Sequence, residues 1–150
     1  MKKIFLCVAL QTGLFMSVMS QTTSEEKEVL GLVNNFFILM DKQDSVSFQK
    51  LHLEGARYYM VYKQRDSIKT NMRDVTDFHF NPKYIIKERM RDKGVKVEIQ
   101  DRVAMVWAPY DLWENNTFSH CGIDVFTLLK TPAGWKIASL SFSMEKDECK

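Results

Sequence analysis

The sequence predicts an α+β domain in which helices come first and a curved, mostly antiparallel sheet follows. Residues 24–40 place apolar side chains at helical spacing. Residues 103–144 form three segments rich in β-branched and aromatic residues, separated by turns at 115–116 and 131–134. Helices gathered before strands are typical of α+β proteins. Because 150 residues suit one hydrophobic core, we expect a single domain over residues 21–150.

The first twenty residues have the pattern of a secretory signal peptide. Lys2 and Lys3 precede an apolar run at 4–18, and the segment Val18-Met19-Ser20 ends in a small residue, as cleavage sites do. We expect cleavage after Ser20 and an exported protein, periplasmic or secreted. The run is short for a membrane span and polar sequence follows it, so no membrane span is expected after signal removal. Removal of the signal peptide takes away two of the 21 basic residues, so 19 basic residues remain and balance the 19 acidic ones. This balance argues against a nucleic-acid partner.

Two helices are predicted near the start of the mature chain. Thr23 and Glu26 have the spacing of a capping box ahead of a helix over about 24–40. Its apolar face is formed by Val29, Val33, Phe36, Phe37 and Met40. Asp44 is expected to cap a second, short helix that ends near Leu51, with a connection at 52–55.

The middle of the chain alternates short strands and turns. We expect a strand at 56–63, a turn at 64–66 and a shorter strand around Ile68. Asn71 is expected to cap a brief helix carrying Val75 and Phe78. Further segments follow in order: a strand at 84–90, a turn at 92–94 and alternating apolar residues at 95–99. Residues 83–96 are rich in Lys and Arg but interleaved with Glu88, Asp92 and apolar residues, which indicates a solvated strand face.

This order of elements resembles the nuclear transport factor 2-like superfamily, in particular small SnoaL-like and ketosteroid-isomerase-like proteins exported by bacteria without assigned activity. The resemblance rests on EEKEVLGLVNNFFILMDKQD, VAMVWAPYDLW, FSHCGIDVFTLLK and GWKIASLS, in that order. It implies a cystatin-like cone, a curved sheet wrapped on helices. It also implies a pocket on the concave face, closed by the first helix, and an outer face that often pairs with a second subunit.

Strand alternation sorts the last three strands into two faces. A two-residue turn at 115–116 would place Trp107 opposite Asp124 and Asp111 opposite His120. A four-residue loop at 131–134 would place Asp124 opposite Ser141. We therefore expect a mixed pocket face whose ligand-binding candidates are Trp107, His120, Asp124 and Ser141, completed by Tyr59 and Phe36.

The opposite face is almost wholly apolar and is the expected dimer interface. It comprises Ala104, Val106, Ala108, Cys121, Ile123, Val125, Leu140 and Phe142. The converse arrangement, with this apolar face packed on the helices, stays open at this stage because an apolar face suits both kinds of contact.

Asp124 is the most informative single residue, because a carboxylate in mid-strand is costly to bury without a partner. One interpretation makes it a general base or ligand anchor with a raised pKa that shares a proton with His120. The other makes it a structural group bonded to a serine, to His120 or to an arginine. Ketosteroid isomerase uses an Asp base with a Tyr and a protonated Asp as donors, and that triplet cannot be placed on this sequence residue by residue.

Other chemistries find little support in the sequence. The three histidines, at 52, 79 and 120, lack metal-ligand spacing, and no phosphate-binding or dinucleotide motif is present. We therefore expect neither a metal nor a cofactor. Cys121 and Cys149 would remain after signal removal, either joined in a disulfide or as a buried and a free thiol.

The sequence thus favours an exported domain that binds a small, partly apolar molecule. The first alternative is a proton-transfer enzyme, an isomerase or dehydratase, with Asp124 as base, His120 as its partner and Tyr59 as a donor. The second is a dimeric interaction domain whose pocket is vestigial.

Overall fold

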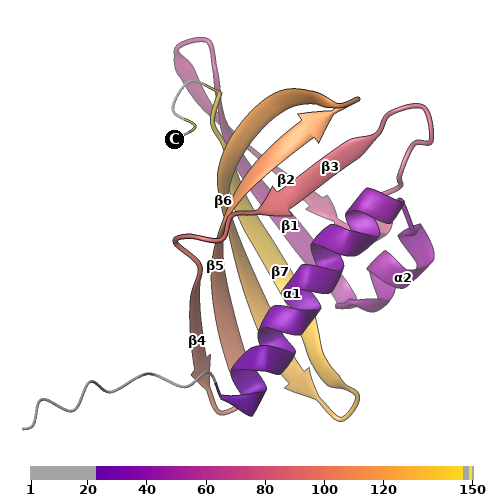
Figure 1. Ribbon diagram of the computed structural model, residues 1–150, viewed down its shortest axis with the longest axis vertical. Coiled ribbons are helices and arrows are strands. Elements are labelled where there is room, and N and C mark those ends of the chain that lie inside the picture. Colours follow the sequence, from indigo (N-terminus) through magenta and orange to yellow (C-terminus); the bar gives the residue numbers. More distant parts are fainter. Residues whose placement is uncertain (1–22, 147–148, 150) are drawn as a thin grey trace, which may run out of the picture.

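The computed structural model describes residues 23–146 and residue 149. The expected signal peptide at 1–20 lies outside the described residues. Figure 1 shows one long helix lying across the concave side of a single curved sheet, with a short second helix beside its C-terminal end. The predicted α+β class is confirmed.

Both helices begin where their caps predict. Helix α1, Ser24–Lys42, starts with a capping box in which the Glu26 amide donates to Thr23 Oγ1 over 3.2 Å and the Thr23 amide donates to Glu26 Oε2 over 3.3 Å. Helix α2, Ser45–Lys50, starts at Asp44, whose Oδ1 accepts from the Ser47 amide over 3.0 Å. The buried face of α1 carries the five predicted apolar residues.

Within the described part of the chain, seven strands follow the helices. They are β1 (His52–Gln64), β2 (Ser67–Asp74), β3 (Ile86–Met90), β4 (Lys96–Gln100), β5 (Val103–Glu114), β6 (Thr117–Thr131) and β7 (Gly134–Met144). Two expectations for the middle of the chain are wrong. Residues 52–55 belong to β1, where the pairing with β7 is irregular and Gly55 has φ of 74°. Asn71 is paired within β2, so the brief helix is instead a 3-10 turn at Val75–Asp77.

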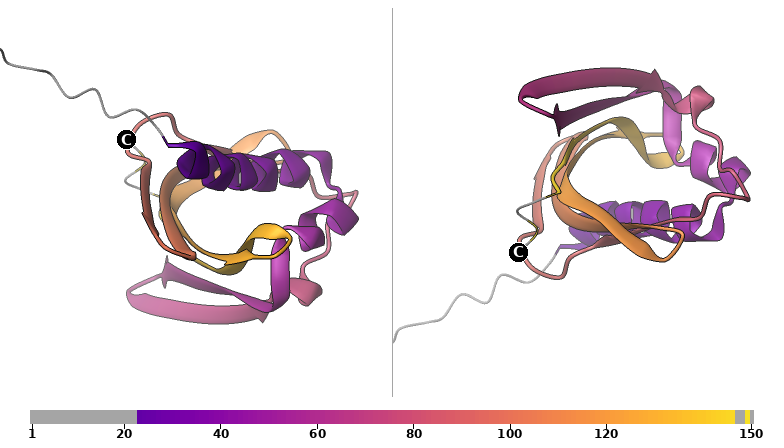
Figure 2. Two further views of the ribbon diagram at one scale, coloured as in Figure 1. Left: turned by 90° about the horizontal axis from the view of Figure 1, so that it is seen from below. Right: turned by 90° about the horizontal axis from the view of Figure 1, so that it is seen from above.

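The sheet has the order β2-β1-β7-β6-β5-β3, and β4 also pairs with β5. The β1–β7 pairing is parallel and the other pairings are antiparallel. Figure 2 shows the sheet curling around α1, while the β1–β2 hairpin extends away from the helix side. Side chains of α1 and of the concave face form one hydrophobic core.

Two β-bulges change which residues face the helices. The β5–β6 register follows the predicted turn as far as Trp113 opposite Phe118, but Leu112 then pairs with His120, which leaves Ser119 extra. The β6–β7 register shifts in the same way between Thr127 and Leu128, which leaves Ala138 extra. Because side chains alternate with period two, each extra residue exchanges the faces beyond it.

The predicted cross-strand pairs are therefore wrong by one residue. Trp107 lies opposite Val125 and not opposite Asp124, and Asp111 lies opposite Cys121 and not opposite His120. Asp124 itself pairs with Ala108 on β5 and with Phe142 on β7, in place of Ser141.

Candidate functional site

The concave face of the sheet and helix α1 line a cavity of about 100 Å³, called here the interior cavity. Helix α1 contributes Phe36 and Met40 to its wall. The strands contribute aromatic and aliphatic side chains together with two carboxyl groups, those of Glu88 on β3 and Asp124 on β6. The site is thus an apolar chamber with a few converging polar groups, the usual composition of a small-molecule site.

The six ligand-binding candidates from the sequence divide between two places. Phe36, His120 and Asp124 line the interior cavity. Tyr59, Trp107 and Ser141 lie on the convex face, along a groove of about 770 Å³ called here the outer groove. The expectation that all six share one pocket is wrong, because the two bulges turn Trp107 and Ser141 away from Asp124.

The apolar set expected on the outer face divides as well. Ala104, Val106, Ala108 and Leu140 belong to the buried core. Ile123 and Val125 instead line the outer groove, and Cys121 joins the C-terminal segment. The convex face therefore combines aliphatic side chains with the aromatic rings of Tyr59 and Trp107, which are 45% and 39% exposed.

Glu88 is the residue that sequence reasoning missed. It is only 7% exposed and lines the interior cavity, whereas its neighbours Lys87 and Arg89 lie on the opposite face of β3. The expectation of a solvated face is therefore wrong at this position. The available signal was the period-two spacing of Ile86, Glu88 and Met90, which places the three side chains on one face.

Glu88 and Asp124 form a buried pair of carboxyl groups joined by a side-chain hydrogen bond. Burial raises the pKa of Glu88 to about 8. Burial and then the nearby charge of Glu88 raise the pKa of Asp124 well above its usual value. Asp124 Oδ2 is buried and, apart from the contact with Glu88, has no hydrogen-bond partner among the described residues. The pair therefore retains protons at neutral pH.

Two tyrosine hydroxyls near this pair already donate to other groups. Tyr110 OH donates to the Ser143 carbonyl over 2.7 Å. His52 Nδ1 lies 2.9 Å from the Phe48 carbonyl, and burial lowers the pKa of His52 to about 4. The neutral ring therefore has its proton on Nδ1, and its Nε2 accepts from Tyr58 OH over 2.7 Å. Both tyrosine oxygens are left as acceptors.

The interpretations drawn from the sequence included a contact between His120 and Asp124. In the structure His120 has a different partner. Its Nδ1 lies 3.0 Å from Ser119 Oγ, the hydroxyl of the extra residue in the β6 bulge. Burial lowers the pKa of His120, so the ring is neutral at pH 7. The partner of Asp124 in the cavity is consequently Glu88.

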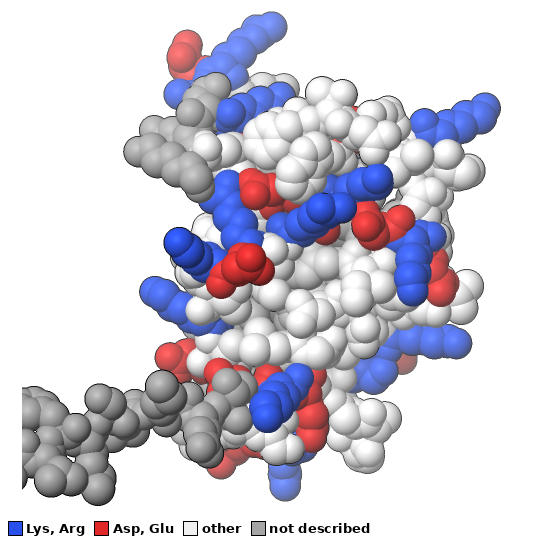
Figure 3. Space-filling view, viewed as in Figure 1, with Lys and Arg blue, Asp and Glu red and all other residues white. Residues whose placement is uncertain are grey.

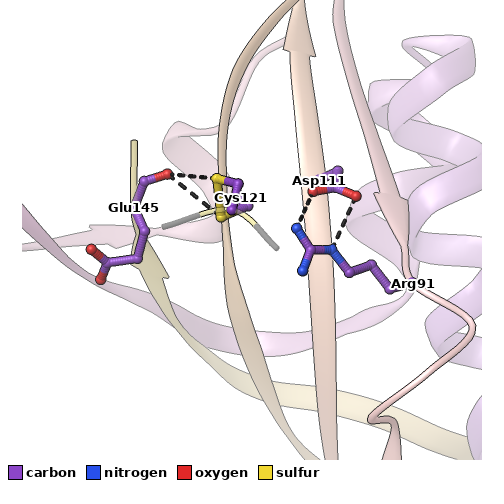
Figure 4. A network of polar contacts seen from close by, with 5 residues as sticks. Arg91, Asp111, Cys121 and Glu145 are labelled. Carbon is purple, nitrogen blue, oxygen red and sulfur yellow. Dashed lines mark hydrogen bonds and ion pairs between the residues drawn. A yellow bond between two sulfur atoms is a disulfide. The ribbon is translucent and has the colours of Figure 1, made fainter. Parts of the chain in front are cut away.

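The C-terminal segment is fixed onto β6 behind the cavity. A disulfide joins Cys121 and Cys149, which is one of the two states expected from the sequence. The Cys121 amide donates to the Glu145 carbonyl over 3.0 Å, and the Glu145 amide donates back over 2.7 Å. Figure 4 shows this connection beside the two-pronged ion pair of Arg91 and Asp111, with N–O distances of 3.0 and 2.5 Å.

The described residues offer little for a metal site or a membrane span. No group of three His, Cys, Asp or Glu side chains in this part of the chain could hold a metal ion. Among the same residues, no helix is long and apolar enough to cross a membrane. Figure 3 shows basic and acidic side chains interspersed over the face that carries α1 and β3.

Comparisons with known proteins identify the fold. No protein-family model matches the chain, and no curated protein matches it. A nuclear transport factor 2-like protein with a cystatin-like fold from Novosphingobium aromaticivorans aligns with a TM-score of 0.63 at 14% identity, over 83% of this chain and 84% of that one. A nuclear transport factor 2-like superfamily protein from Salmonella enterica serovar Typhimurium gives 0.62 at 14% identity, over 82% and 92%.

A third solved structure is the β subunit of benzoate 1,2-dioxygenase from Burkholderia mallei. It aligns with a TM-score of 0.61 at 13% identity, over 88% of this chain and 97% of that one. The present chain therefore has the nuclear transport factor 2-like fold, and the prediction made from its sequence is confirmed. At such identities the likeness establishes the fold alone, and function has to be argued from the site.

Proposed function

We propose that the interior cavity binds a small, partly apolar molecule through a polar contact at Asp124. The observation that supports this function is Asp124 Oδ2, which is buried among apolar walls and has no hydrogen-bond partner among the described residues other than Glu88. An unsatisfied buried polar atom costs about 1–3 kcal/mol. A ligand that fills the cavity and bonds this oxygen recovers that free energy and also removes apolar surface from water.

The cavity sets the size of the ligand. An apolar cavity of about 150 Å³ accepts benzene. The interior cavity, at about 100 Å³, is smaller. It holds a compact molecule or molecular fragment of about four or five heavy atoms, by the same comparison. Its aromatic and aliphatic walls favour a branched hydrocarbon frame with a single polar end.

Native mass spectrometry of the protein purified from its own host tests this function. We expect a bound species that is retained under gentle ionisation. Leu140→Phe, which fills the cavity, should lose the bound species, whereas Ser141→Phe, one residue further along β7 on the outer groove, should keep it. Thermal denaturation establishes that both variants are folded. An empty wild-type protein, or equal retention by both variants, would contradict the proposal.

A second candidate is proton transfer, supported by the hydrogen-bonded pair of Glu88 and Asp124. Two carboxyl groups with raised pKa values can hold one proton between them and pass it to a substrate. In this version Glu88 replaces His120 as the partner of Asp124, and Tyr59 has no part because it lies on the convex face. An isomerase or dehydratase activity that survives Asp124→Asn would eliminate this candidate.

Export and dimerisation complete the proposal. Export rests on the signal-like residues 1–20, and an N-terminus at Gln21 in the mature protein would establish it. Dimerisation rests on the exposed apolar side chains of the convex face, among them Tyr59, Met72 and Trp107. If the cavity proves empty, this face supports the alternative of an interaction domain.

A further inference from the structure

We propose that the interior cavity selects a small organic cation, an alkyl amine, whose ammonium group takes the place of a proton held between Glu88 and Asp124. This inference rests on the proposed function and names its ligand class. The cavity wall contains two carboxyl groups and, among the residues that the structure describes there, neither Lys nor Arg. An anionic ligand would find no counter-charge, whereas a cation would find two carboxyl groups that can ionise.

The hydrogen-bonding capacity of the cavity also matches an amine. The hydroxyl protons of Tyr58 and Tyr110 are donated to His52 and to the Ser143 carbonyl, so both phenol oxygens are acceptors. Burial, and then the charges of the nearby carboxyl pair, raise the pKa values of both tyrosines. Together with the buried oxygen Oδ2 of Asp124, the polar groups of the cavity are mainly acceptors. An ammonium group has three donors and no acceptor, so it suits this set better than a carbonyl does.

Aromatic rings supply the remaining attraction. The wall of the cavity includes the rings of Phe36, Tyr58, Phe78, Tyr110 and Phe142. A cation near the face of an aromatic ring is attracted by its quadrupole, most strongly where water is excluded. The same rings would contact the alkyl part of the amine. The carboxyl groups would thus bind the ammonium end of such a ligand, and the aromatic rings would contact its alkyl end.

Cation binding in this cavity should be linked to proton release. The groups that face the carboxyl pair are Tyr58 from β1, Tyr110 from β5 and the neutral His120 from β6, while α1 and β7 contribute apolar side chains. Since the pKa of Glu88 is about 8, an ammonium group must displace a proton at lower pH. The dissociation constant of the amine should fall about tenfold per pH unit between pH 6 and pH 8 and level off above.

Three probes with the same branched carbon frame test the ligand class: isobutylamine, isobutanol and isobutyrate. They are a cation, a neutral molecule and an anion at pH 8. Titrations followed by the amide resonances of Glu88, His120 and Asp124 should show isobutylamine binding about tenfold more tightly than isobutanol, with isobutyrate not binding. The double variant Glu88→Gln and Asp124→Asn should lose amine binding while it retains isobutanol, because the shape of the cavity is kept and its charge removed.

The outcomes separate this inference from the function on which it rests. If isobutanol binds as tightly as isobutylamine, the cavity is a binding site but the amine inference is overturned. If none of the probes shifts the three resonances, the inference and the proposed binding function both fail. Amine binding that persists in Leu140→Phe, which fills the cavity, would place the cation elsewhere and would overturn the inference. Ser141→Phe is the matched control and should bind the amine as the unaltered protein does.

Discussion

Glu88→Gln should make the protein markedly more stable at alkaline pH. Glu88 has a pKa of about 8 in the folded protein, against 4.5 for an unperturbed glutamate, because burial disfavours its charged form. Between these values the folded state binds a proton that the unfolded state has released, so stability falls as pH rises from about 4.5 to 8. A difference of about 3.5 pKa units corresponds to about 5 kcal/mol lost by pH 9. Glutamine keeps the shape and cannot ionise, so the variant escapes this loss.

Urea unfolding at pH 5, 7 and 9, followed by tryptophan fluorescence, measures the effect. The free energy of unfolding of the Glu88→Gln variant should decrease less steeply with pH than that of the unaltered protein, because only the buried Asp124 still resists ionisation in the variant. Glu98→Gln is the matched control, because Glu98 is an exposed glutamate on β4, the neighbouring partner of β5. If the unaltered protein and Glu88→Gln show parallel pH profiles, the carboxyl pair is solvated and our reasoning about the cavity is wrong.

Three further predictions concern other parts of the structure. Gly122→Ala should destabilise the protein by about 2–3 kcal/mol in thermal denaturation, because a Cβ there would overlap the Ser143 carbonyl and the Tyr110 ring. Cys149→Ser should lower stability by about 3 kcal/mol, since the disulfide closes a loop with a sequence separation of 28; equal urea midpoints would contradict this. Trp107→Glu, which places a charge on the convex face, should convert the proposed dimer to a monomer in sedimentation velocity, whereas Leu140→Phe should leave the dimer intact.

The sequence predicted those elements whose signals are local. The capping box at Thr23, the helical spacing of α1 and the turn at 115–116 each lie within a few residues, and each is confirmed. The alternation of β5 is equally clear, because Ala104, Val106 and Ala108 all belong to the core. Local signals were sufficient to predict the α+β class and the antiparallel meander of β5, β6 and β7.

The side chains that line the site could not be predicted in the same way, because their positions depend on the register between strands. No sequence signal around Ser119 or Ala138 predicts a bulge, yet each bulge exchanges the two faces of the strand beyond it. Tyr58 and Tyr59 illustrate the consequence. They are adjacent and chemically identical, but Tyr58 lines the interior cavity while Tyr59 lines the outer groove.

The partner of Asp124 is the clearest case of a contact that only the tertiary structure supplies. The two bulges leave this carboxyl between Ala108 and Phe142 on the adjacent strands, and neither side chain offers a hydrogen bond. The carboxyl reaches Glu88 on β3, which is separated from β6 by β5. Because two acids that share a buried site are costly without a third group, the pair is difficult to explain as a purely structural feature. The cavity beside it provides the space in which a ligand can offset that cost.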